Sequence, residues 1–169
     1  FLPNDPVQSK QCQEQFDRIA EEEGQQVLGW RHVPTNDSLL GPTAKSGKPD
    51  FKQIFISRGA NVKDEAEFER KLYVIRKRIE HTIANSDLSE RNHFYIPSLS
   101  YRTCVYKGML TCLQFEPMFP DVSEPDFESA MALVHQRFST NTFPSWDLAH
   151  PFRYIAHNGE INTVRGNIN

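Results

Sequence analysis

The chain has 169 residues, 38% hydrophobic and 24% charged, a composition typical of one globular domain and not of a disordered or fibrous protein. Its 19 Lys and Arg against 22 Asp and Glu give a formal net charge of −3, too balanced for the basic field that non-specific nucleic-acid binding needs. There is no membrane-length apolar run and no basic leader or apolar signal core at the start. We expect a protein of the cytoplasm or an organelle stroma, without nucleic-acid or membrane partners.

The three cysteines, Cys12, Cys104 and Cys112, form no C-x-x-C pair and are odd in number. This predicts reduced thiols and neither a disulfide framework nor a zinc ribbon. None has a neighbouring cation or helix start that would lower its thiol pKa, so we expect no catalytic cysteine in this chain.

The two ends of the sequence suggest a longer parent. The chain starts with Phe1 instead of Met, and residues 166–169 fall within what reads as the opening of a helix. We expect a segment of a longer polypeptide.

The first third of the chain predicts a helix, a strand and a loop. Val7–Glu23 carries apolar residues among Gln, Lys and Glu, and Gly24 stands where a helix would end. Gln25–Val33 is typical of a strand. The Gly, Pro, Ser and Lys of Gly41–Asp50 predict a loop.

A second strand and a long helix follow. Phe51–Ser57 is apolar enough to be a central strand. Asp64 with Glu67 resembles a capping box, which predicts that a helix begins there. Steps of three and four place one set of apolar residues on a single face of this helix: Phe68, Leu72, Ile75, Ile79 and Ile83. Its other face mixes Arg and Lys with Glu, which favours a solvated surface over a basic docking patch.

The remaining apolar runs are typical of strands. Phe94–Ser100 and Thr103–Leu110 predict two strands, and 117–125 predicts an acidic, proline-containing connector. Met131–His135 and Phe152–Ala156 lead directly into two polar segments. Because scaffolds commonly present functional loops where strands end, the polar segments are the candidate site.

The first polar segment, His135–Thr142, contains Arg137 followed by hydroxyls and a carboxamide. A planar guanidinium matches a carboxylate bidentately, and the neighbouring hydroxyls and backbone N–H groups would complete a cradle for an amino-acid carboxylate. A buried structural ion pair of Arg137 with Glu160 is the competing interpretation, and the Ser/Thr/Asn series is also typical of turn capping.

The second polar segment, Tyr154–Asn162, contains Asn158-Gly159. Asn-Gly is the strongest two-residue hairpin signal. An Asn side-chain N–H beside a Gly backbone N–H is also the arrangement of an oxyanion hole for acyl transfer. Three histidines nearby, His135, His150 and His157, have no usual zinc spacing, which favours hydrogen-bonded structural histidines over metal ligands.

Four runs together point to a known family: H-Q-R-F-S-T-N-T-F-P-S-W at 135–146, A-H-N-G-E-I-N-T-V-R-G-N at 156–167, L-G-W-R-H-V-P at 28–34 and Y-K-G-M at 106–109. They closely resemble the amidotransferase domain in the large subunit of the glutamate synthase family. A shorter pattern, Arg137 with Thr140 and then 158–160, is similar to all class II glutamine amidotransferases. Others of that class generally have Trp and His at the positions of Phe138 and Asn141, which favours the glutamate synthase family.

The resemblance implies an α+β fold of the N-terminal-nucleophile hydrolase type, which is a four-layer αββα sandwich with antiparallel sheets. Residues 1–169 would form part of one such domain, so the sandwich would be incomplete in this chain. It also implies roles for five residues. Asn158 and Gly159 match the oxyanion hole, Arg137 matches the residue that binds the glutamine α-carboxylate, and Thr140 and Asn141 match the substrate-contacting pocket wall. No metal site is implied.

In that family an N-terminal cysteine attacks the glutamine side-chain amide, and the ammonia reaches a flavin domain that aminates 2-oxoglutarate. That nucleophile has no counterpart here, because Phe1 cannot replace it, so we expect this chain alone to be inactive. FMN, an iron–sulfur cluster and the electron donor, a partner subunit or ferredoxin, are implied for other domains. A non-catalytic binding module of the same fold is the alternative from another class.

Overall fold

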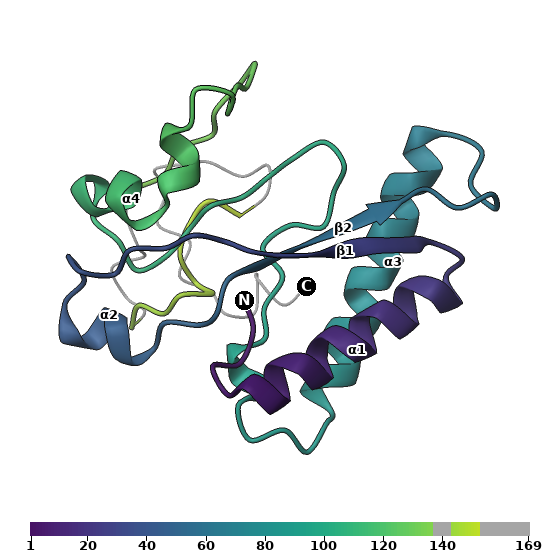
Figure 1. The fold of residues 1–169 in the computed structure, drawn as a ribbon, viewed down its shortest axis with the longest axis horizontal. Coiled ribbons are helices and arrows are strands. Elements are labelled where there is room, and N and C mark those ends of the chain that lie inside the picture. Colours follow the sequence, from purple (N-terminus) through teal and green to yellow (C-terminus); the bar gives the residue numbers. More distant parts are fainter. Residues whose placement is uncertain (137–142, 153–169) are drawn as a thin grey trace. The chain divides into compact units, whose positions relative to one another are not determined.

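The computed structural model describes residues 1–136 and 143–152, and the chain divides into two compact units (Figure 1). Unit 1 comprises Phe1–Thr35 and Pro49–Cys104, and unit 2 comprises Asn36–Lys48 and Val105–Asn169. The elements of unit 1 are helix α1 (Pro6–Glu22), strand β1 (Gln26–His32), strand β2 (Lys52–Ser57), helix α3 (Glu65–Ala84) and the 3-10 helix η1 (Arg91–His93). Those of unit 2 are helix α2 (Pro42–Ser46), helix α4 (Cys112–Met118) and the 3-10 helix η2 (Pro120–Ser123).

Helix α1 confirms the first predicted helix and begins and ends with standard caps. The Asp5 carboxylate accepts a hydrogen bond from the backbone N–H of Gln8 at 2.8 Å. At the other end Gly24 has a φ of +75°, in the left-handed region that glycine adopts without steric cost. The N–H of Gly24 donates to the Glu21 carbonyl and that of Gln25 to the Ala20 carbonyl, the two bonds of a Schellman motif.

Gln25 fixes the corner between α1 and β1. Its side chain is buried, and its amide nitrogen donates to the Glu23 carbonyl at 2.9 Å and to the Asn61 side-chain oxygen at 3.0 Å. Its amide oxygen accepts the backbone N–H of Gly59 at 2.9 Å. The buried amide is therefore satisfied, and it ties this corner to the loop that follows β2.

Strands β1 and β2 confirm both predicted strands, and they form an antiparallel pair that runs from Gln26 opposite Ser57 to His32 opposite Lys52. The register shifts between Val27 and Gly29, which is a bulge where Gly29 has a φ of +150°. Within residues 1–136 and 143–152, β1 is the only strand that β2 pairs with, so the predicted central position is not found there.

Helix α3 confirms the strongest helix prediction. The Asp64 carboxylate accepts the N–H of Glu67 at 2.7 Å, while the Glu67 carboxylate accepts the N–H of Lys63 at 2.8 Å, one residue before its expected partner. The helix buries the predicted apolar face: Phe68, Leu72, Ile75, Ile79 and Ile83.

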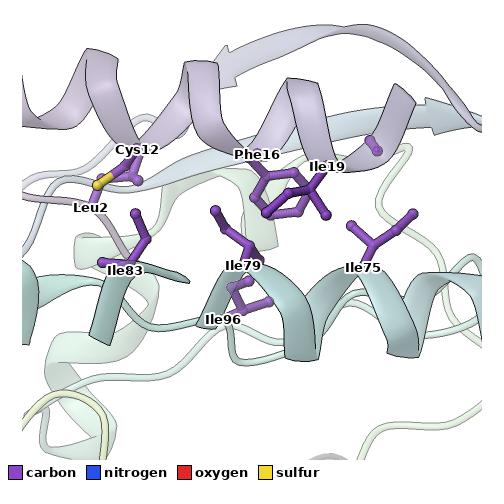
Figure 2. Packing of buried hydrophobic residues seen from close by; sticks show 9 residues of the cluster. Leu2, Cys12, Phe16, Ile19, Ile75, Ile79, Ile83 and Ile96 are labelled. Carbon is purple, nitrogen blue, oxygen red and sulfur yellow. The ribbon is translucent and has the colours of Figure 1, made fainter. Parts of the chain in front are cut away.

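The core of unit 1 lies between α1 and α3. Figure 2 shows Phe16 and Ile19 of α1 pointing toward Ile75 and Ile79 of α3. The cluster consists of nine buried residues: Leu2, Cys12, Phe16, Ile19, Ala20, Ile75, Ile79, Ile83 and Ile96. Burying each large aliphatic or aromatic side chain contributes roughly 1.5–3 kcal/mol, so these two apolar stripes are the main source of the stability of unit 1.

The polar face of α3 also contacts α1. Lys71 donates to the Glu23 carboxylate at 2.9 Å, and Arg78 reaches both Glu22 and Glu23. Because these two cations hydrogen-bond it, the pKa of Glu23 is lowered. The mixed charges predicted for this face are thus largely paired with each other and with the end of α1.

The two strands predicted for 94–100 and 103–110 are wrong. Residues 94–110 are irregular. Part of this segment is hydrogen-bonded to side chains of α3 and not to a neighbouring strand. Ser100 donates to the Glu69 carboxylate at 2.6 Å, and the Tyr101 hydroxyl donates to Glu65 at 2.7 Å. These contacts are made by side chains, without strand pairing.

Three predictions in unit 2 are also wrong. The loop expected at 41–50 contains α2, which Pro42 opens at a position where its missing N–H costs nothing. The connector expected at 117–125 contains the end of α4 and then η2. Residues 131–135 form no strand, and Met131 and Val134 are largely exposed. Of the run 152–156, only Phe152 belongs to the described residues.

Candidate functional site

The five predicted site residues lie outside the residues that the structure describes: Arg137, Thr140, Asn141, Asn158 and Gly159. The geometry of the carboxylate cradle and of the oxyanion hole therefore remains a prediction, as does the competing Arg137–Glu160 ion pair. What the structure describes is the chain on either side of the first polar segment, up to Gln136 and from Phe143 to Phe152.

Trp146 anchors this joining segment, residues 143–152, within unit 2. Its side chain is buried, and its indole N–H donates to the Ala44 carbonyl of α2 at 2.9 Å. The ring also lies directly against Gly108, where an added Cβ would be 2.3 Å from the ring carbon Cζ3. A real Cβ does not approach an aromatic carbon that closely, so the position of Trp146 requires glycine at 108.

Lys107 makes two contacts with the same segment although it is only 2% exposed. Its Nζ donates to the Asp147 carbonyl at 2.7 Å and lies 4.6 Å from the centroid of the Phe152 ring. A carbonyl oxygen and an aromatic face are both electron-rich partners for an ammonium group. They offset part of the cost of removing the charge from water.

Two of the three candidate histidines lie together. The rings of His135 and His150 stack with centroids 4.3 Å apart, and the His150 ring meets the Phe152 ring edge-on at 4.6 Å. His157 lies outside the described residues. Among the residues that the structure describes, no group of three His, Cys, Asp or Glu side chains is arranged to hold a metal ion.

The cysteines differ in environment. Cys12 is fully buried in the core of unit 1, and burial raises the pKa of its thiol to about 11. Cys104 and Cys112 are exposed. A thiol with a raised pKa and no access to solvent is a poor nucleophile.

Sequence reasoning assigned no role to Lys107 or Trp146, although both lie in the runs quoted above. The sequence did contain a signal for Lys107, because this lysine stands within the apolar run 103–110. A lysine is rarely buried unless it has partners, so its position in such a run indicates specific contacts. In the described part of the chain, no helix combines the length and apolarity that a membrane crossing requires.

The family model for class-II glutamine amidotransferases matches residues 1–169, and the chain belongs to this family. The chain is also similar to the large chain of the NADPH-dependent glutamate synthase of Bacillus subtilis, with 51% identity over 169 residues, all of this chain and 11% of that protein. The corresponding Azospirillum brasilense protein is 48% identical over 146 residues, 86% of this chain and 9% of that protein.

A plant relative extends the comparison. The chloroplastic ferredoxin-dependent glutamate synthase 2 of Arabidopsis thaliana is 43% identical over 171 residues, which cover all of this chain and 10% of that protein. The chain thus spans about a tenth of the length of the curated relatives it matches. The resemblance to the amidotransferase domain of glutamate synthases, inferred from four short runs, is confirmed.

Proposed function

We propose that this chain is part of the glutaminase domain of a glutamate synthase, an enzyme of glutamate biosynthesis. L-glutamine would be hydrolysed to glutamate and ammonia, and the ammonia would be channelled to a flavin domain that aminates 2-oxoglutarate. The observation that carries this proposal is the match of the class-II amidotransferase model to residues 1–169. The 51% identity to a glutamate synthase large chain over all 169 residues supports the choice within the class.

The chemistry assigns a separate task to each proposed site residue. The planar fork of Arg137 would hold the glutamine α-carboxylate, a geometry that Lys cannot reproduce. When a cysteine thiolate attacks the side-chain amide carbon, the amide oxygen becomes an oxyanion. The side-chain N–H of Asn158 and the backbone N–H of Gly159 would stabilise it, while Thr140 and Asn141 line the pocket.

The proposal includes the architecture and the other components of the enzyme. We expect 1–169 to be part of one N-terminal-nucleophile domain with a four-layer αββα sandwich. The described residues do not fit an iron–sulfur cluster, because Cys12 is buried in the core of unit 1 and is not grouped with the exposed Cys104 and Cys112. FMN, the iron–sulfur cluster and the electron donor, a partner subunit or ferredoxin, belong to other parts of the enzyme. Its compartment is the cytoplasm or an organelle stroma.

An Arg137→Lys substitution in the full-length protein tests the proposal. Glutamate formation from glutamine should fall by about tenfold to a hundredfold, because one charge-assisted hydrogen bond and the bidentate geometry are lost. Glutamate formation from added ammonia bypasses this site and should change less than about twofold. Both rates are measured with 2-oxoglutarate and the reductant in excess.

The matched control is Arg102→Lys, the same change at an exposed arginine of unit 1. It should leave both rates unaltered. If Arg137→Lys lowers the glutamine and ammonia rates equally, Arg137 has a structural role and the carboxylate assignment is wrong. If the wild-type protein forms no glutamate from glutamine, the non-catalytic binding module is the better description.

A further inference from the structure

Lys107 is a buried cation that contacts the joining segment, residues 143–152. Its ammonium group donates to the Asp147 carbonyl at 2.7 Å and faces the Phe152 ring at 4.6 Å. These partners are five residues apart, so a single side chain holds both the middle and the end of residues 143–152. The described part of this segment ends at Phe152, six residues before Asn158.

The residues on either side of Lys107 are themselves held firmly. The Tyr106 hydroxyl donates to the buried Asp121 carboxylate at 2.7 Å, and its ring packs edge-on against Phe119 at 5.3 Å. Gly108 lies against the Trp146 ring. The backbone on both sides of Lys107 is therefore held in place by packing and hydrogen bonds. This support fixes the position of the Lys107 ammonium group.

The same cluster also reaches the chain before the first polar segment. The His150 ring stacks on the His135 ring at 4.3 Å and meets the Phe152 ring at 4.6 Å. His135 precedes Arg137 by two residues. The Lys107, His150 and Phe152 contacts thus connect the described chain preceding Arg137 with the described chain preceding Asn158.

We infer that Lys107 is a positioning residue for glutamine hydrolysis, which holds residues 143–152, the stretch of chain that joins the segment containing Arg137 to the segment containing Asn158. This inference rests on the proposed function. The substrate must be held by its carboxylate at one segment and by its amide oxygen at the other. A displacement of about 1 Å between two such groups costs up to about a hundredfold in rate.

The test compares three variants of the full-length protein. Lys107→Met keeps the length and apolar stem of the side chain but removes the ammonium group. We expect kcat/KM for glutamine to fall by about tenfold to a hundredfold, and the ammonia-dependent rate to stay within about twofold. Lys107→Arg restores a cation and should recover part of the loss. Lys45→Met is the matched control, because it makes the same change at an exposed lysine of unit 2.

Phe152→Leu keeps the inference testable if Lys107→Met does not fold. It removes the aromatic face but keeps an apolar side chain, and KM for glutamine should rise by about threefold. Equal loss of the glutamine and ammonia rates, no recovery by Lys107→Arg, or an unchanged KM in Phe152→Leu would overturn the positioning role alone. A wild-type protein without glutamine-dependent activity would overturn the proposed function itself.

Discussion

The two units of the chain are held together in different ways. Unit 1 has a periodic core, in which apolar stripes of α1 and α3 face each other over several turns. In unit 2, individual contacts between distant positions hold irregular chain and short helices, among them Trp146 with Ala44 and Lys107 with Asp147. The first arrangement repeats equivalent side chains at regular steps along two helices, whereas the second joins positions that are far apart in the sequence.

The two units also differ in how they relate to the proposed site. The residues proposed to bind substrate belong to unit 2 by their position in the sequence, and not to the helical core of unit 1. A periodic core tolerates small shifts because each side chain has many neighbours of the same kind. The buried ammonium group of Lys107 instead contacts one carbonyl and one ring, from two different positions of residues 143–152.

The largest effect is expected in the periodic core. Ile79 is fully buried in α3, and Ile79→Ala should lower the free energy of unfolding of unit 1 by about 2–5 kcal/mol because it leaves a cavity. Val74→Ala, at a position of α3 that is 39% exposed, should cost less than about 0.5 kcal/mol. Hydrogen exchange of α1 and α3 peptides measures both. Similar values for the two variants would mean that this core does not dominate the stability of unit 1.

An intermediate effect is expected at the closest single contact of unit 2. Gly108→Ala would place a methyl group 2.3 Å from the Trp146 ring, and displacing that ring should cost about 1–3 kcal/mol. Gly41→Ala is the control, because an added Cβ there has no atom within 4 Å. Exchange protection of peptides covering residues 143–152 should fall only in Gly108→Ala. Unchanged protection would mean that the segment is not held by this packing.

The smallest effect is expected for the charges between α1 and α3. The folded-state pKa of Glu23 lies below its ordinary 4.5, so its ionised form stabilises unit 1 above that pH. Glu23→Gln should therefore cost about 1 kcal/mol or less at pH 7, since the pair is partly solvated. The difference from wild type should narrow as the pH falls below 4.5 and through the lowered pKa.

Hydrogen exchange of α1 peptides over this pH range, corrected for the intrinsic exchange rate, measures the difference. Glu14→Gln serves as the control, because the pair of Glu14 with Lys10 on the same helix is exposed. A Glu23 effect that is independent of pH would show that its contribution is not electrostatic.

The sequence predicted unit 1 well because its elements are encoded locally. Residues three and four apart define the buried face of α3, and Asp64 and Gly24 mark where helices begin and end. No comparable period exists in 94–110, where aromatic residues contact α3 without pairing as strands. A strand and an irregular buried segment have the same composition, so composition alone could not separate them.

Unit 2 was harder to predict for two physical reasons. Its helices α2 and α4 are too short to show a period, although Thr111 and Gln114 form a capping box that marks the start of α4. Its buried contacts join distant positions, as between Lys107 and Asp147, which no local pattern reveals. The site residues were assigned by family resemblance, and their geometry remains a prediction.

The hydrogen bond from Trp146 to Ala44 has a consequence for synthesis. Its two residues are 102 positions apart, and the ribosome adds that many residues in about 5–20 s. The residues of helix α2 are therefore synthesised well before Trp146, with which α2 forms this hydrogen bond. Throughout that interval the nascent chain must keep residues 36–48 available for late docking, while the flanking segments 1–35 and 49–104 can already assemble around their own core.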